Sequence, residues 1–176
     1  AAMFNNAVFA MAVEDLAQIE VPEKAEYIRV IVLELNRIAS HLMFFGAFGL
    51  DVGALTPILY AFRERERVLN LLEMVSGARL TYNFMRFGGV RADLPAGFDT
   101  ECKSFMKELP GRLDDYDSLL TGNEIFSIRT RGVAPISGER CIAMGLSGPI
   151  VRASGIRHDL RRAQPYSVYP KFDFDI

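Results

Sequence analysis

Three side chains near the end of one long apolar segment could take part in ligand binding or proton chemistry. Asp51 lies in the glycine-rich stretch LDVGALTP at 50–57, where Asp is favoured because its carboxylate can cap a turn. Met43 carries a flexible thioether, which suits either a long apolar ligand or the packing of a core. His41 lies just before it, and a buried imidazole hydrogen-bonded to a neighbour is its simplest interpretation. These residues form the first candidate site.

A second candidate site follows the next apolar segment and is rich in arginine. Arg79 ends the sequence SGAR, and Arg86 begins RFGGVRADLP at 86–95. Guanidinium groups at these places serve either internal salt bridges or contacts with a partner. The pair Gly88-Gly89 permits a close backbone approach or a positive φ. Because the sequence contains neither GxGxxG nor a GxxxxGKS or GxxxxGKT pattern, we expect this pair to bind no nucleotide phosphate.

The composition argues against several classes of function. A formal net charge of −2, with 20 basic and 22 acidic residues mixed along the chain, favours no nucleic-acid partner. The basic group within 152–162 is short, and we interpret it as a solvated or subunit-facing element. Cys102 and Cys141 lie far apart and outside any CxxC pair. The cysteines are therefore not expected to ligate zinc or an iron–sulfur cluster.

The length and hydropathy fit one ordinary domain. The chain has 176 residues, 50% of them hydrophobic, and a mean hydropathy of +0.14, which allows a sizeable core or an apolar partner surface. The most apolar stretch, 42–59, is interrupted by Asp51, glycines and Pro57, so it does not provide the ~20 apolar residues of a membrane span. The sequence starts with neither an initiator Met nor a secretory signal, and we expect a piece of a longer protein.

Helical periodicity predicts three long helices that would position the first candidate site. The first covers 3–18. The second begins at Pro22, has acidic residues in its first turn and runs to about Phe48. The third begins with Thr56 as its N-cap and ends at 76–77, where Ser-Gly is a typical stop.

The rest of the chain is predicted to be less regular. Residues 86–98 read as an irregular loop, and a fourth helix covers 105–120 with a kink or a break at Pro110. The last third is predicted as short helices and connections, with 125–133 and 167–174 as candidate strands. The expected fold class is mainly α, with about four long helices in an antiparallel bundle core and an irregular C-terminal third.

Eight sequence phrases occur in order along essentially the whole chain. They are AVEDLAQIEVPEKAEYIRV, ELNRIASHL, LDVGALTP, AFRERERVL, SGAR, RFGGVRADLP, RASGIRHDLRRAQPYSVY and FDFDI. Together they resemble the motifs of the 49-kDa-type subunit of respiratory complex I, an NADH:quinone oxidoreductase. The resemblance implies a fold like that of the large subunit of nickel–iron hydrogenases. It also makes residues 1–176 a single central helical part of a longer subunit, without its N- and C-terminal parts.

The resemblance implies a role for the first candidate site. In this family a quinone is reduced in a cavity between the 49-kDa-type subunit and an iron–sulfur partner subunit. Asp51 matches the aspartate that orients a head-group histidine located elsewhere in the 49-kDa-type subunit. A carboxylate that accepts from an imidazole fixes its tautomer and holds its proton ready for a quinone. Met43 and His41 would line the quinone cavity.

The second candidate site would lie near the iron–sulfur cluster that the partner subunit holds. The residues concerned are Arg79, Thr81 and Arg86, and buried guanidinium groups would raise the potential of an anionic cluster. Many family members carry a histidine where this chain has Thr81. Because a hydroxyl group cannot become a cation, the resemblance implies a cluster potential that depends only weakly on pH.

The function that the resemblance implies is that of a subunit of a proton-pumping NADH:quinone oxidoreductase, a translocase. The chain would be peripheral, on the cytoplasmic side of the cell membrane, with quinone as substrate and other complex I subunits as partners. It would ligate no cofactor itself and would be inactive as a fragment. The large subunit of a membrane-bound nickel–iron hydrogenase is one alternative, and a purely structural helical domain is another. Electron supply from ferredoxin or a deazaflavin carrier in place of NADH also stays open.

Overall fold

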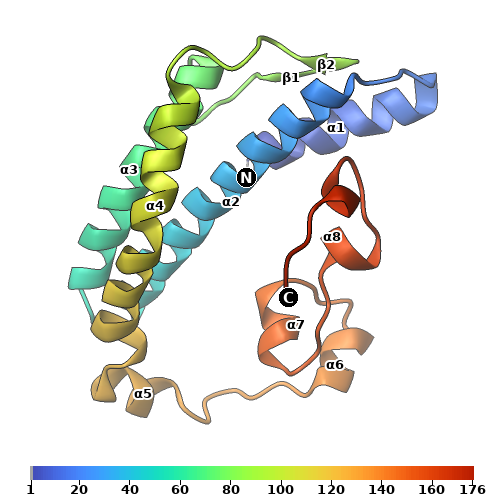
Figure 1. Cartoon of the computed structure of the whole chain (residues 1–176). Helices are drawn as coiled ribbons and strands as arrows, with labels where there is room; N and C mark the ends of the chain where they lie inside the picture. Colours follow the sequence, from blue (N-terminus) through green and yellow to red (C-terminus); the bar gives the residue numbers. More distant parts are fainter. Residues whose placement is uncertain (1) are drawn as a thin grey trace. The chain divides into compact units, whose positions relative to one another are not determined.

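The computed structural model describes residues 2–176, which are mainly helical (Figure 1). Within this range the only sheet has two strands. The chain divides into two compact units, Ala1–Arg129 and Thr130–Ile176. The prediction of a mainly α fold is confirmed. The bundle arrangement, the likeness to hydrogenase large subunits and the place of 1–176 within a longer subunit stay predictions.

Helices α1 (Ala2–Ala17) and α2 (Glu23–Asp51) are joined by a short turn that ends at Pro22, the N-cap residue of α2. Both were predicted from their apolar stripes. One face of α2 packs into the core, and its buried residues include Ile28, Val32, Leu35, Ala39 and Leu42. The helix continues past its predicted end at Phe48 to Asp51. Asp51 therefore lies in the last helical turn and not in the following loop.

Two glycines in the last third of α2 allow helix α3 (Thr56–Ser76) to pack closely against it (Figure 1). A Cβ added at Gly46 would lie 2.9 Å from the Cα of Ile58, and one added at Gly49 would lie 3.1 Å from the Cβ of Pro57. Glycine usually weakens a helix, but here it removes the side chain that would hold the two backbones apart. The helix can thus extend beyond its predicted end.

The start of α3 differs from the prediction, whereas its end agrees. The N-cap residue is Leu55, Thr56 is the first helical residue, and no side chain caps the helix, so the predicted capping role of Thr56 is wrong. Pro57 supplies the fixed φ that suits a first turn. At the other end Gly77 adopts φ +73, and its N–H donates to the carbonyl oxygen of Glu73 at 2.7 Å. The buried face includes Ala61, Val68, Leu69, Leu72 and Val75.

An antiparallel hairpin replaces the start of the predicted irregular loop. Strand β1 (Met85–Arg86) pairs with β2 (Gly89–Val90) in a register that sets Met85 opposite Val90. Gly88 in the turn has φ +78, a left-handed conformation that favours glycine. The loop prediction is therefore wrong for these residues, because the glycine pair reverses the chain into a hairpin.

Helix α4 (Phe98–Tyr116) continues directly into a π-helical turn, η1 (Asp117–Thr121). Pro110 lies inside α4 without dividing it, so the predicted break does not occur. Phe105 and Tyr116 are buried on either side of the proline, in the core that α4 shares with the first three helices. This packing holds the helix together across the hydrogen bond that proline cannot make.

Helix α2 is, among residues 2–176, the one helix long and apolar enough to cross a membrane by length and composition. Its 18-residue window has a mean hydropathy of 1.3, and 44% of that window is buried inside the protein. Core helices pass the same test, so this property is weak evidence for a span.

Helix α5 (Glu124–Thr130) follows η1 at the boundary of the two units. The side-chain oxygen of Asn123 accepts hydrogen bonds from the N–H groups of Ile125, at 2.9 Å, and Phe126, at 3.3 Å. An Asn that satisfies these N–H groups starts a helix. The predicted strand at 125–133 is therefore wrong.

The second unit consists of short helices and connections, as predicted. Its elements are α6 (Gly138–Ala143), α7 (Pro149–Ala153), α8 (Leu160–Ala163) and a 3₁₀ turn, η2 (Tyr169–Lys171). The strand predicted at 167–174 is wrong. Pro170 lies in the first turn of η2 and has no N–H to donate to a neighbouring strand.

Part of the basic group in the second unit is neutralised internally. Asp159 is buried and accepts from Nη2 of Arg161 at 2.7 Å, with Nη1 of Arg152 3.8 Å away. The hydrogen bond from Arg161 lowers the pKa of Asp159 to about 2. Arg162 pairs with Asp173 at 2.9 Å. These arginines connect parts of the unit, where a solvated or partner-facing role was expected.

Candidate functional site

Asp51 is exposed at the end of α2, and no residue within 2–176 donates a hydrogen bond to its carboxylate. The turn after it is closed by the backbone alone. The N–H of Val52 donates to the carbonyl oxygen of Phe48 at 3.2 Å, and that of Gly53 donates to the carbonyl oxygen of Leu50 at 2.9 Å. The capping role that the sequence suggests is therefore not adopted, and the carboxylate is available to another group.

The turn after Asp51 is clamped by Arg129 of α5. Nη1 of Arg129 donates to the carbonyl oxygen of Val52. Gly53 has φ +89, and a Cβ added there would lie 2.8 Å from Nη1 of Arg129. A side chain at this position would both strain the backbone and displace the arginine.

Two exposed aromatic rings of α2 and a half-buried ring of α5 lie next to one another near Asp51. We call Phe44, Phe48 and Phe126 the aromatic strip. Phe44 and Phe48 stack with ring centroids 5.7 Å apart, and Phe48 meets Phe126 edge to face at 5.9 Å. Positions 44, 48 and 51 share one helix face because they are four and three residues apart. Phe44 is 65% exposed, so the carboxylate lies at the end of an apolar surface.

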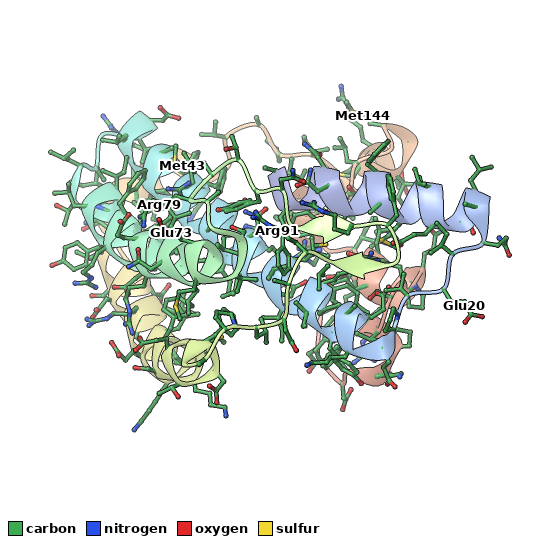
Figure 2. All side chains as sticks on the ribbon, turned by 90° about the horizontal axis from the view of Figure 1, so that it is seen from above. Glu20, Met43, Glu73, Arg79, Arg91 and Met144 are labelled. Carbon is green, nitrogen blue, oxygen red and sulfur yellow. The ribbon has the colours of Figure 1, made fainter. Side chains whose placement is uncertain are left out.

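Met43 and His41 lie on different sides of α2. Met43 is 44% exposed and lines a cavity of about 230 Å³ together with Leu80 and Tyr82 (Figure 2 labels Met43). His41 lines another cavity, of about 380 Å³, that Tyr116 also borders. His41 is exposed, so the expectation of a buried imidazole is wrong. The structure does not bring these two residues and Asp51 into one cavity.

Arg79, just beyond α3, is held by acidic and polar residues of that helix. Its Nη1 donates to Oε2 of Glu73 at 2.8 Å and to Oδ1 of Asn70 at 2.7 Å, and its Nη2 pairs with Glu66. Figure 2 shows Arg79 beside Glu73. The hydrogen bond to Glu73, with the negative charges of both glutamates, raises the pKa of Arg79 further. The sequence left open whether Arg79 forms internal salt bridges or contacts a partner. In the structure it forms internal salt bridges.

Thr81 and Arg86 complete the second candidate site. Thr81 is exposed in the segment between α3 and the hairpin. Arg86 is half-buried in β1, and its Nη1 donates to Oδ1 of Asn83 at 2.6 Å and to the carbonyl oxygen of Met85 at 3.0 Å. The guanidinium groups of Arg79 and Arg86 are thus bound to different partners, and neither is fully buried.

A buried ion pair positions the hairpin that carries Arg86. Nη2 of Arg29 in α2 donates to Oε1 of Glu14 in α1 at 2.6 Å, and Nη1 donates to Oε2 at 2.9 Å. The same guanidinium bonds the carbonyl oxygen of Gly89 at 2.8 Å, while Glu14 accepts from the N–H of Gly88 at 2.8 Å. The side chains of Arg29 and Glu14 are only 3% and 7% exposed. The hydrogen bond from Arg29 keeps the pKa of Glu14 below its ordinary value.

Sequence reasoning missed this ion pair, and it also missed Asn36 and Arg65. The available signal was a charged or polar residue inside an apolar stripe, as Arg29 and Asn36 are on the buried face of α2. For metals, the described part of the chain contains no group of three or more His, Cys, Asp or Glu side chains that could hold an ion.

Bacterial proteins named as the D-type subunit of NADH-quinone oxidoreductase are similar to nearly the whole chain. The protein of Desulforamulus reducens is 53% identical over 176 residues, which are 100% of this chain and 48% of the relative. Those of Clostridium beijerinckii and Geobacillus thermodenitrificans are 53% and 52% identical over 174 and 175 residues, 99% of this chain and 47% and 48% of the relatives. The chain spans about half the length of the curated relatives it matches.

Residues 51–176 match the family described as the 49 Kd subunit of respiratory-chain NADH dehydrogenase. The chain belongs to this family, and the resemblance carried by its eight sequence phrases is confirmed.

Proposed function

We propose that this chain is the central part of a 49-kDa-type subunit that forms, with an iron–sulfur partner subunit, the cavity in which a proton-pumping NADH:quinone oxidoreductase reduces quinone. The relatives' name supplies the complex and the substrate class. The assembly would be peripheral on the cytoplasmic side of the membrane, with other complex I subunits as partners. In the full-length protein the helices would form an antiparallel bundle of the hydrogenase large-subunit type.

The observation that carries the proposal is the state of Asp51. A carboxylate at the C-terminal end of a helix is disfavoured by the helix dipole, and this one has no compensating donor among residues 2–176. The aromatic strip beside it exposes apolar side chains of Phe44 and Phe48 to water, which does not stabilise an isolated chain. Both features fit a surface that is completed by another polypeptide and an apolar ligand.

The proposed role of Asp51 is to orient a histidine that lies outside this chain. A carboxylate that accepts from one imidazole nitrogen keeps the proton there and leaves the other nitrogen aimed at the quinone head group. The proton would pass from the imidazole to the quinone oxygen, and Asp51 would stabilise the ring while it is charged. Asp51 would thus both orient the imidazole and stabilise its positive charge.

Met43 is the better supported of the two proposed quinone contacts. Its half-exposed thioether borders a cavity and can adapt to a flexible apolar chain. His41 lies on another side of α2, at a separate cavity. A quinone that contacts Met43 would therefore reach His41 only by extending around the helix.

The second candidate site is proposed to lie near the cluster of the partner subunit. Arg79 is already paired with two glutamates, so its effect on the cluster potential would be reduced. Arg86 keeps a guanidinium without a carboxylate partner in the described residues. Thr81 supplies no titratable group, and we propose a cluster potential that changes little with pH.

The test is Asp51→Asn in the full-length protein, assayed as NADH:quinone turnover in membranes. We expect turnover to fall by about 10²-fold or more, as for loss of a group that supports proton transfer. Glu20→Gln is the matched control, because Glu20 is an exposed carboxylate in the turn between α1 and α2 (Figure 2). Unchanged turnover in Asp51→Asn, at normal assembly, would reject the role.

A further inference from the structure

The cavity beside Met43 contains polar groups that the chain itself does not satisfy. It has a volume of about 230 Å³ and lies among α1, α2, α3 and the segment that follows α3. Its polar lining includes Asn36 and Arg65 together with Ser40 and Tyr82, and its apolar lining includes Met43 and Leu80. Oδ1 of Asn36 and Nε of Arg65 are buried and have no hydrogen-bond partner among residues 2–176.

Arg65 differs from the arginines next to it on α3. Arg63 donates to Glu64 at 2.6 Å, and Arg67 donates to Glu108 at 2.8 Å. Arg65 makes no ion pair within the described residues, although it is half-buried. A half-buried charge without a counter-ion is unfavourable, so such groups are usually paired.

The positive charge of Arg65 acts inside the cavity. Burial raises the pKa of Tyr82, which lines the same cavity, and the charges of Arg65 and Arg79 oppose that rise. Arg79 has its own glutamates, so Arg65 is the cation left to attract an anionic group.

Asn36 adds a second requirement for the occupant. The residue is 5% exposed, and its Oδ1 accepts no hydrogen bond within residues 2–176. Ser40 nearby is already engaged, since its hydroxyl donates to the backbone carbonyl of Asn36 at 2.9 Å. The occupant must therefore bring a donor for Oδ1 of Asn36 in addition to an acceptor for Arg65.

We propose that this cavity receives an acidic side chain of the same subunit, from a segment that lies outside residues 1–176. The carboxylate of that residue accepts from Arg65, and a backbone N–H of the same segment donates to Asn36. Half-exposed Met43 and Leu80, which is 58% exposed, contact the rest of the segment. A hydrated free anion would gain nothing from this apolar rim. The chain spans about half the length of its relatives, which is why we place the occupant in the rest of the same subunit. The inference does not depend on quinone chemistry.

Carbodiimide crosslinking of the assembled complex tests this proposal. The reagent joins a carboxylate to a lysine amine that contacts it, with loss of water, so Arg65→Lys in the full-length protein converts the salt bridge into an isopeptide bond. We expect mass spectrometry to find one dominant crosslink from position 65 to an Asp or Glu outside 1–176. The sequence of the crosslinked peptide shows whether it belongs to the same subunit, as proposed, or to a partner subunit, which would overturn the proposal.

Two further variants make the test decisive. Arg67→Lys is the matched control and should crosslink to Glu108 inside the chain. Asn36→Asp places a competing carboxylate in the cavity and should remove the crosslink from position 65. The proposal is overturned if Arg67→Lys crosslinks while Arg65→Lys gives no crosslink, or only crosslinks within 1–176.

Discussion

Two carboxylates of the first unit, Glu14 and Asp51, are in opposite environments. Glu14 is buried and bonded to Arg29 and to the backbone of the hairpin, whereas Asp51 is exposed and has no donor among residues 2–176. The first carboxylate is part of what gives the unit its structure. The carboxylate of Asp51 makes no hydrogen bond among residues 2–176 that would stabilise the fold. The contrast separates residues that build the protein from those left for a partner or a ligand.

Removing the buried ion pair should have the largest effect. Arg29→Met leaves Glu14 as an uncompensated buried charge and frees the hairpin carbonyls, so we expect a loss of about 3–5 kcal/mol in the free energy of unfolding. Urea denaturation of the purified protein measures this. The double variant Glu14→Gln with Arg29→Met should lose less than Arg29→Met alone. Arg37→Ala, which breaks the half-exposed pair with Glu34 and the contact of the guanidinium with the ring of Phe4, should cost less, about 1–2 kcal/mol. Equal losses for Arg29→Met and Arg37→Ala would contradict the contrast.

The turn after Asp51 should tolerate substitution less well than an ordinary glycine site. Gly53→Ala forces a side chain into a backbone with φ +89 and toward Arg129. We expect a loss of about 1–2 kcal/mol in the free energy of unfolding, together with reduced quinone turnover. Gly111→Ala in α4 is the control, since nothing lies within 4 Å of the added Cβ. That variant should gain about 0.5–1 kcal/mol.

The buried carboxylate of Glu14 should also affect the stability of the protein in acid. The folded-state pKa of Glu14 is lowered from 4.5, mainly by its hydrogen bond from Arg29. Its contribution is therefore fully present above the unfolded pKa and is lost as the pH falls from about 4.5 through the lower folded value. Glu14→Gln should flatten the dependence of the denaturation midpoint on pH in that range. An unchanged slope in Glu14→Gln would contradict this expectation.

The second candidate site should give the smallest effect. We expect the potential of the partner's cluster to be nearly constant between about pH 6 and 8, because Thr81 cannot bind a proton. Thr81→His should introduce a slope toward about −60 mV per pH unit, the limit for one proton per electron. A redox titration of the assembled complex decides this, and a steep slope in the unsubstituted protein would contradict the expectation.

The four long helices of the first unit could be predicted because their apolar residues recur at helical spacing, whereas α5 could not. The positions of the helix ends were less predictable. The end of α2 was predicted at about Phe48, but the close contact of Gly46 and Gly49 with α3 lets the helix continue to Asp51. The hairpin depends on Glu14 and Arg29, which are distant from it in the sequence. No local pattern reports such a contact.

The candidate site could be predicted only in part. The motifs identify Asp51 and Met43, yet no sequence pattern indicates that the loop closes without Asp51 or that His41 is exposed on another side of α2. The unsatisfied groups of Asn36 and Arg65 could not be predicted either. They become visible only when the helices are packed and each donor can be checked against each acceptor.

The central claim is that the Asp51 carboxylate supports quinone reduction and not folding. The most direct measurement compares, in membranes containing Asp51→Asn, electron transfer from NADH to quinone with transfer to an artificial acceptor that is reduced before the quinone cavity. We predict that quinone reduction falls by about 10²-fold, while transfer to the artificial acceptor and the stability of the protein stay unchanged. Equal quinone activity in Asp51→Asn and in the unsubstituted protein would contradict the account.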